Sequence, residues 1–336
     1  MSKVSIRRFA RSTEGGLTGI CVVFFVGLVI ASGGDLLEPN SLRVLLQFLA
    51  VPVLIGLAQM VVLAVGQLNL AVGAIGGFAA VAMGVLMVDH GVPVPLALLI
   101  GFGLATLAGL ANGLLVVLTR INGFIVTLAT MTVLIGVQYR LVGTRTVDDY
   151  PQALKSFGAY AVFGVLPVIF GVALLVAVVL AIVLRRTVPG RQLLASGGNP
   201  IAARLSGISN DRSVILAHTI SGAILGVAAV LTVASSPGVN KSIGGDWLLP
   251  SFAAPIIGGA LLTGGSAVIL GTVLAAFIVR FVDTARAEFS LEPSWVNFVV
   301  GAVVLGSVVL GQVRTRRQAR TQVVKTPDVA VTGGVA

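Results

Sequence analysis

The sequence predicts an all-α, polytopic membrane protein of about ten transmembrane helices with one short cytoplasmic helix. Of its 336 residues, 57% are hydrophobic and only 10% are charged, whereas about a quarter of the residues in soluble domains are charged. The apolar residues form repeated runs of roughly 20 residues, the length that crosses a bilayer as a helix. The 42 glycines are typical of membrane helices that pack closely together.

The apolar runs follow one another with short polar turns between them. A basic segment precedes the first run, and Gly33-Gly34-Asp35 is a poor cleavage site, so we interpret this run as a helix and not as a removed signal. The only cysteine, Cys21, lies in this run, excludes an internal disulfide and is interpreted as a packing residue. The predicted helices are 17–33, 44–65, 69–88, 93–118, 122–142, 160–184, 213–235, 249–263 (short and broken by glycines), 266–284 and 294–313.

The charge distribution orients these helices. With ten helices and a cytoplasmic N-terminus, the inner segments hold 15 of the 22 cations and three of the 12 acids. Such an excess of Lys and Arg marks the cytoplasmic side. We therefore expect a multi-pass protein of a bacterial-type cytoplasmic (inner) membrane with both termini in the cytoplasm. Its predicted parts are a tail at 1–16, a transmembrane domain at 17–313 with a cytoplasmic loop at 185–212, and a disordered tail at 314–336.

The loop at 185–212 contains the signals of one short helix. Asn199 is a good N-cap, Pro200 suits the first helical position, and Gly207 can adopt the left-handed conformation that ends a helix. The helix is therefore predicted from Pro200 to Ser206.

This short helix carries an unexplained apolar stripe. Ile201, Leu205 and Ile208 recur at the spacing of one helix face, in a segment that should be solvated. Because an isolated helix shorter than about 12 residues is marginal in water, we expect it to dock on a partner.

The sequence offers little for enzyme chemistry. The two histidines, His90 and His218, are far apart, and no nucleophile–base set, metal-ligand pair or pair of core carboxylates can be assembled, so no catalytic or metal-binding residue is predicted. His218 is interpreted as a packing residue. Asp283 lies between Arg280 and Arg286 near a helix end, which favours a local ion-paired cluster over an ion-coupling group. The net charge of +10 is explained by the Lys and Arg residues that mark the cytoplasmic side of the membrane, so no nucleic-acid partner is expected.

Neutral polar side chains inside or beside the predicted helices are the candidates for a transport pathway. Amides and hydroxyls suit a hydroxyl-rich solute, because each buried hydroxyl needs a hydrogen-bond partner. The alternative is that they form interhelical hydrogen bonds, and for any single residue this stays open. The set comprises Gln59, Gln67, Asn69, Asn112, Asn122, Thr127, Thr130, Thr132 and Gln138. The pathway candidates chosen from it are Gln67, Asn69, Asn112, Asn122, Thr127 and Thr130.

Two glycine-rich segments predict broken helices. Asn69 is a plausible N-cap within the segment 66–77, and Pro255, Gly258-Gly259 and Gly264-Gly265 interrupt the chain later. Broken helices within a membrane mark binding sites in transporters.

Four segments resemble the permease subunits of monosaccharide ABC importers of the ribose, xylose and galactose type, within a wider group that includes branched-chain amino acid permeases. QLNLAVG at 67–73 is similar to the family's GIDLSVG, and GFIVTLATM at 123–131 is similar to FIVTLGTM. The other two are the loop at 190–208, with its Ala-Ala-x-x-x-Gly core, and the glycine-rich block at 253–272.

The resemblance implies the permease subunit of an ATP-driven importer for a sugar or similar neutral solute. It implies two ATPase subunits that hold ATP and Mg, an extracytoplasmic solute-binding protein, and a second permease copy, identical or paralogous. The chain itself would bind lipid on its outer face and no cofactor. The resemblance also implies that the short helix is a coupling helix that binds the ATPase. The residues implied in this contact are Asn199, Pro200, Ile201, Ala202, Ala203, Arg204, Leu205 and Gly207.

Departures from the family pattern leave the solute open. Ile201 stands where many relatives carry a charge, and Asn69, Ala71 and Gln67 replace the usual Asp, Ser and Gly. The segment 247–252 also lacks the usual acid. A nucleoside or a branched-chain amino acid is the alternative solute, and an ion-coupled carrier is the alternative transporter class.

Overall fold

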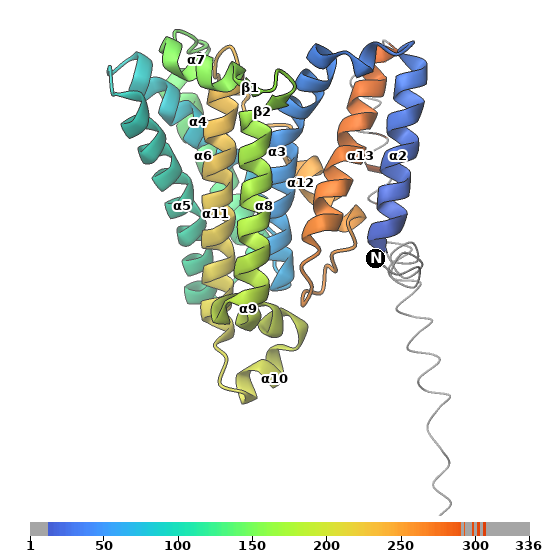
Figure 1. Ribbon diagram of the computed structural model, residues 1–336. Helices are drawn as coiled ribbons and strands as arrows, with labels where there is room; N and C mark the ends of the chain where they lie inside the picture. The colour runs from blue at the N-terminus through green and yellow to red at the C-terminus, as the bar shows by residue number, and fades with distance from the viewer. Residues whose placement is uncertain (1–12, 290–291, 293–297, 299–300, 303–304, 307–336) are drawn as a thin grey trace, which may run out of the picture.

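The computed structural model describes residues 13–289 together with 292, 298, 301, 302, 305 and 306. Short elements mark the two ends of a helix bundle (Figure 1). At one end lie α9 (Val188–Gly198) and α10 (Pro200–Leu205). At the other lie α7 (Gln152–Ala159) and an antiparallel hairpin of β1 (Ala161–Val162) and β2 (Leu166–Pro167), a small departure from the all-α prediction. We call these the α10 end and the α7 end.

Six described helices are long and apolar enough to cross a membrane. They are α2 (Thr13–Ala31), α3 (Pro39–Ala64), α5 (Val94–Thr119), α6 (Gly123–Val142), α8 (Val168–Arg186) and α11 (Asn210–Ser235). The 3-10 turn η1 (Asp35–Leu37) links α2 to α3. Three further helices are shorter or more charged, namely α4 (Val72–Val88), α12 (Leu248–Ile257) and α13 (Ile269–Glu288).

The helical class is confirmed, and several of the described helices could cross a membrane, but the count of about ten is not confirmed. The predicted helix 160–184 begins only at Val168, because the hairpin occupies the preceding residues. The predicted helix 249–263 ends at Ile257, ahead of Gly259, whose φ of +95° is incompatible with a helix. The predicted helix 294–313 and the tail at 314–336 lie largely outside the described residues, as does most of the tail at 1–16.

α3 lies in the core of the bundle. Every residue from Val53 to Ala64 is buried, and the helix contacts α8, α11, α12 and α13. A helix that is buried on all sides belongs to the interior. In contrast, α2 lies beside α13 at the rim (Figure 1), and few residues of α2, α5 and α6 are buried. Their exposed faces suit contact with lipid or with another subunit.

α5 and α11 pack together through small residues. Ala105, Gly109 and Gly113 recur every fourth residue on α5 and face Gly222 and neighbouring backbone of α11. At Gly109 an added Cβ would lie 2.3 Å from the His218 carbonyl oxygen. The two backbones are therefore in direct contact.

We expect Gly109→Ala to destabilise the bundle and Gly103→Ala, in the same helix, to leave it unchanged or slightly more stable. The first substitution places a methyl group against backbone, and overpacking of this kind costs about 1–3 kcal/mol. A Cβ at Gly103 meets nothing within 4 Å, and Ala is favoured over Gly in a helix by roughly 1 kcal/mol. Thermal unfolding of the purified variants in detergent measures the difference. Equal midpoints for the two variants would contradict this packing.

Candidate functional site

The predicted short helix is present as α10 and is capped at both ends. The Asn199 side chain accepts a hydrogen bond from the backbone N–H three residues on, at 3.0 Å. Gly207 has a φ of +79°, and the N–H of Ile208 donates back to the Ala203 carbonyl at 2.9 Å, which completes a Schellman-type C-cap. The predicted caps are confirmed, although the helix ends at Leu205 instead of Ser206.

Two residues of the predicted apolar stripe point away from the protein. Ile201 is 76% exposed and Leu205 is 85% exposed, and the small or polar side chains of Ala202 and Arg204 are also exposed. Ile208 is partly buried, so the exposed stripe has two members instead of the predicted three. α10 thus presents an uncovered apolar surface.

The prediction of a single helix in the loop at 185–212 is wrong, because α9 precedes α10. The Thr187 side chain caps α9 by accepting from the N–H of Gly190 at 3.2 Å. Leu193 is fully buried and anchors the helix to the bundle. Thr187 followed by Pro189 near the first helical position is a start signal that could have revealed it.

Asn210, at the start of α11, holds the two short helices together. Its side-chain oxygen accepts from the Ser196 hydroxyl of α9 at 2.8 Å. Its amide nitrogen donates to the carbonyl of Pro200, the first residue of α10, at 2.9 Å. Sequence reasoning missed this residue, because its partners are ten and fourteen residues away and depend on the tertiary path of the loop.

Three glycine-containing segments meet at the α10 end, namely the turn after α3, the end of α9 and the loop after α12. The N–H of Gly265 donates to the Ala64 carbonyl at 2.9 Å, and a Cβ at Gly197 would lie 1.9 Å from that same oxygen. A Cβ at Gly264 would lie 2.7 Å from the nitrogen of Gly66. The two predicted helix breaks are therefore real and touch the end of α9, just before α10. We call this contact the glycine junction.

Asn69 and Thr127 hold the first break in place. Asn69 does not cap α4 as predicted, because that helix begins only at Val72. Its side-chain oxygen instead accepts from the N–H of Ala71 at 2.9 Å, and its amide lies 3.4 Å from the Ser221 hydroxyl of α11. The hydroxyl of Thr127 on α6 accepts from the N–H of Leu70 at 3.0 Å. The non-helical backbone of the break is thus tied to α6 and α11.

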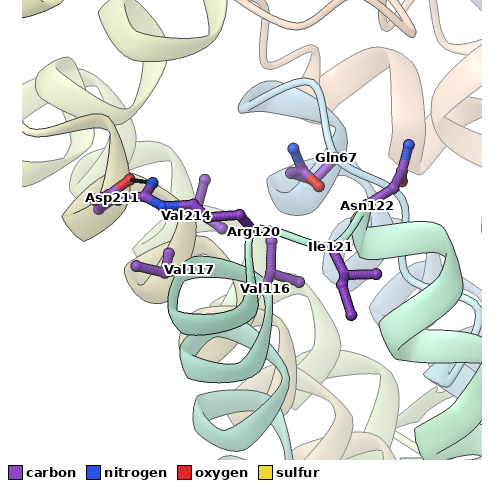
Figure 2. Close-up of a pocket in the computed structure, with 8 residues that line it drawn as sticks. All are labelled: Gln67, Val116, Val117, Arg120, Ile121, Asn122, Asp211 and Val214. Atoms are coloured by element: carbon purple, nitrogen blue, oxygen red, sulfur yellow. Dashed lines mark hydrogen bonds and ion pairs between the residues drawn. The ribbon is translucent and has the colours of Figure 1, made fainter.

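A pocket of about 250 Å³ opens between the α5–α6 turn and the start of α11 (Figure 2). Two of the six predicted pathway residues line it, Gln67 and Asn122, whereas Asn69, Asn112, Thr127 and Thr130 do not. Its remaining lining residues are Val116, Val117, Arg120, Ile121, Asp211 and Val214.

Some of the other polar side chains form hydrogen bonds within the protein, and others do not. The Gln138 amide donates to the carbonyls of residues 240, 241 and 243 at 3.1–3.3 Å, so it holds a loop in place. Thr130 and Thr132 bond to carbonyls of their own helix. Asn112, Gln59 and His218 are fully buried, and their polar atoms have no hydrogen-bond partner among the described residues. Which of these side chains contacts a solute stays a prediction.

The charged cluster on α13 is confirmed as ion-paired. Asp283 lies 2.5 Å from the Arg280 guanidinium and 3.4 Å from that of Arg286. Arg280 also stacks over the Phe48 ring of α3, with 4.9 Å between the guanidinium carbon and the ring centre.

Comparison with known proteins identifies the family. Residues 41–308 match the family model of the branched-chain amino acid transport system / permease component. The autoinducer 2 import system permease protein LsrC of Enterobacter sp. (strain 638) is 31% identical over 304 residues, covering 89% of this chain and 88% of that protein. The fructose import permease protein FrcC of Rhizobium meliloti is 28% identical over 300 residues, covering 87% and 83%. The autoinducer 2 permease LsrD of Escherichia coli O157:H7 is 30% identical over 265 residues, covering 77% and 79%. No solved structure matches the chain.

These matches agree with the four sequence motifs and with the helical membrane fold. The family model covers well over half of the chain, and the alignment with LsrC runs through nearly the whole of both proteins. The resemblance to importer permeases is therefore confirmed. The chain belongs to the family of permease components of branched-chain amino acid transport systems, which includes importer permeases such as LsrC and FrcC.

Proposed function

We propose that this chain is the membrane-spanning permease subunit of an ATP-driven importer for a sugar or similar neutral solute. The observation that carries the proposal is α10, a capped helix that projects from the bundle and exposes Ile201 and Leu205. An apolar stripe on a short solvated helix is explained by a protein that covers it. In an importer, that protein is the ATPase subunit.

The remaining partners follow from the same assignment. Two ATPase subunits bind ATP and Mg, while the permease binds no cofactor. A second permease copy, identical or paralogous, completes the pathway, and an extracytoplasmic binding protein delivers the solute. The excess of Lys and Arg in the loop at 185–212 favours a cytoplasmic α10 end. We accordingly place both termini in the cytoplasm of a bacterial cell, with about ten spans in the complete chain.

The solute class rests on the chemistry of the interior. The buried side-chain amides of Asn112 and Gln59 are uncharged, and each can donate and accept hydrogen bonds. They therefore suit the hydroxyl groups of a neutral solute. One relative is named for fructose import, and this favours a sugar over the alternatives of a nucleoside or a branched-chain amino acid. An ion-coupled carrier is disfavoured because Asp283, the acid farthest inside a described helix, is already paired with two arginines.

Reconstitution distinguishes the two transporter classes. The permease is inserted in liposomes with an ATPase subunit and a binding protein of the same importer, and uptake of labelled sugars is measured. We expect uptake to need both ATP and the binding protein. The permease alone, under a proton or sodium gradient, should give no uptake above that of empty liposomes. Gradient-driven uptake by the permease alone would establish a carrier and refute the proposal. Solute binding by the isolated binding protein identifies the cargo.

A further inference from the structure

An ion pair connects the α5–α6 turn to the start of α11. The two guanidinium nitrogens of Arg120 donate to the two carboxylate oxygens of Asp211, at 2.8 and 3.0 Å. This two-point geometry fixes the orientation of both groups, as a single contact would not. Asp211 lies in the first turn of its helix, where the helix dipole favours an acid.

The backbone at Arg120 is unusual. Its φ of +57° places it in the left-handed region at the C-terminal end of α5, a position that glycine usually occupies. Within the described residues only Phe163 is another non-glycine residue with positive φ. A glycine at this position would relieve the strain but could not reach Asp211. The ion pair therefore explains why an arginine occupies a position whose backbone conformation favours glycine.

The pair stands at the edge of the pocket that Gln67 and Asn122 also line (Figure 2). The side chains of Arg120 and Asp211 remain 70% and 41% exposed. Exposed ion pairs contribute little to stability, because water and salt screen them. The same screening makes the pair easy to break and to re-form. These properties suit a contact that opens in each cycle better than one that holds the fold together.

The residue next to Asp211 is hydrogen-bonded to α10. Asn210, the neighbour of Asp211, bonds to the first residue of α10 and to Ser196 of α9. A shift of α10 therefore pulls on the residue next to the ion pair. We propose, on the basis of the proposed function, that Arg120 and Asp211 are positioning residues that act as a latch. They hold the pocket, as the α10-end mouth of the pathway, at its present width until α10 moves.

A cysteine-labelling experiment tests the latch without requiring transport. In a Cys21→Ser background, Val117→Cys places one thiol on the pocket wall, and its reaction with a membrane-impermeant maleimide is timed in the assembled complex. We expect Arg120→Glu or Asp211→Arg to raise the labelling rate at least about threefold. The exchanged pair, Arg120→Glu with Asp211→Arg, should return it to the starting value. Arg212→Glu, which alters an exposed arginine one residue from Asp211, is the matched control and should leave the rate unchanged.

Solute uptake by the same variants is the second measurement. We expect each single change to lower the solute transported per ATP at least about fivefold, and the exchanged pair to recover within about twofold. The latch is refuted if single variants match the control, or if the exchanged pair is as impaired as the single variants, since the charges would then not be what matters. A wild-type complex that transports nothing would refute the proposed function, while the labelling rates would still decide on the latch.

Discussion

We expect that replacing Ile201 with Asp and Leu205 with Lys in one variant abolishes ATP-driven uptake while the permease still folds and inserts. Both side chains are exposed, so neither substitution removes a contact of the bundle. The acid sits in the first turn of α10 and the base in its last turn, where the helix dipole stabilises each of them. The helix is therefore retained and only its apolar surface is lost.

The expected loss is large because burial of these two side chains would supply much of the docking energy. Covering one leucine or isoleucine side chain contributes about 1.5–3 kcal/mol. Losing both weakens the ATPase contact by more than about a hundredfold, and the new charges add a desolvation cost. Co-purification of the ATPase with the permease, and uptake in liposomes, measure the effect.

The control is an exchange of the same two side chains, Ile201→Leu with Leu205→Ile. It keeps the apolar surface and its volume, so co-purification and uptake should stay near wild type. Normal ATPase binding by the charged variant would show that α10 is not the docking surface.

The sequence could predict α10 because the signals of this helix are local. Asn199 and Gly207 lie at its two ends, and the hydrogen bonds that cap it run no more than a few residues along the chain. The contacts of Asn210 and Arg120 could not be predicted in this way. The partner of Arg120 is 91 residues away, and only the packing of α5 beside α11 brings the two together.

The polar residues of the interior show a second limit of what the sequence can predict. From sequence, Asn112, Gln138 and Asn69 are equivalent, since each is an amide in an apolar helix or beside one. In the structure Gln138 bonds to three loop carbonyls, Asn69 ties a helix break to α11, and Asn112 has no partner among the described residues. For Asn112 and Gln138 the difference depends on the rotation of each helix about its axis, which apolar composition leaves undetermined because every face of these helices is hydrophobic. For Asn69 it depends on the path of the break between α3 and α4.

The second large effect on uptake is expected from Gly197→Ala, a substitution within the glycine junction. An added Cβ would lie 1.9 Å from the Ala64 carbonyl oxygen and 2.8 Å from the nitrogen of Gly265. Both are backbone atoms, and they are joined by a hydrogen bond of 2.9 Å. A methyl group must therefore push α9 away from the end of α3 or break that bond. The first outcome separates α9 and α10 from the two helix breaks, and the second separates the two breaks from each other, so in either case the breaks and α10 no longer move together.

Gly198→Ala is a closely matched comparison, because it makes the same change one residue later in the same helix. Its Cβ would meet only the Gly265 Cα, at 3.6 Å, an ordinary contact distance. We expect uptake to fall at least about tenfold for Gly197→Ala, with a stability loss of about 1–3 kcal/mol, and to stay near wild type for Gly198→Ala. ATPase co-purification should persist in both variants, since α10 itself is unaltered. If the two variants transport equally well, the junction does not link α10 to the pathway, and the bonds of Asn210 would be left as the connection.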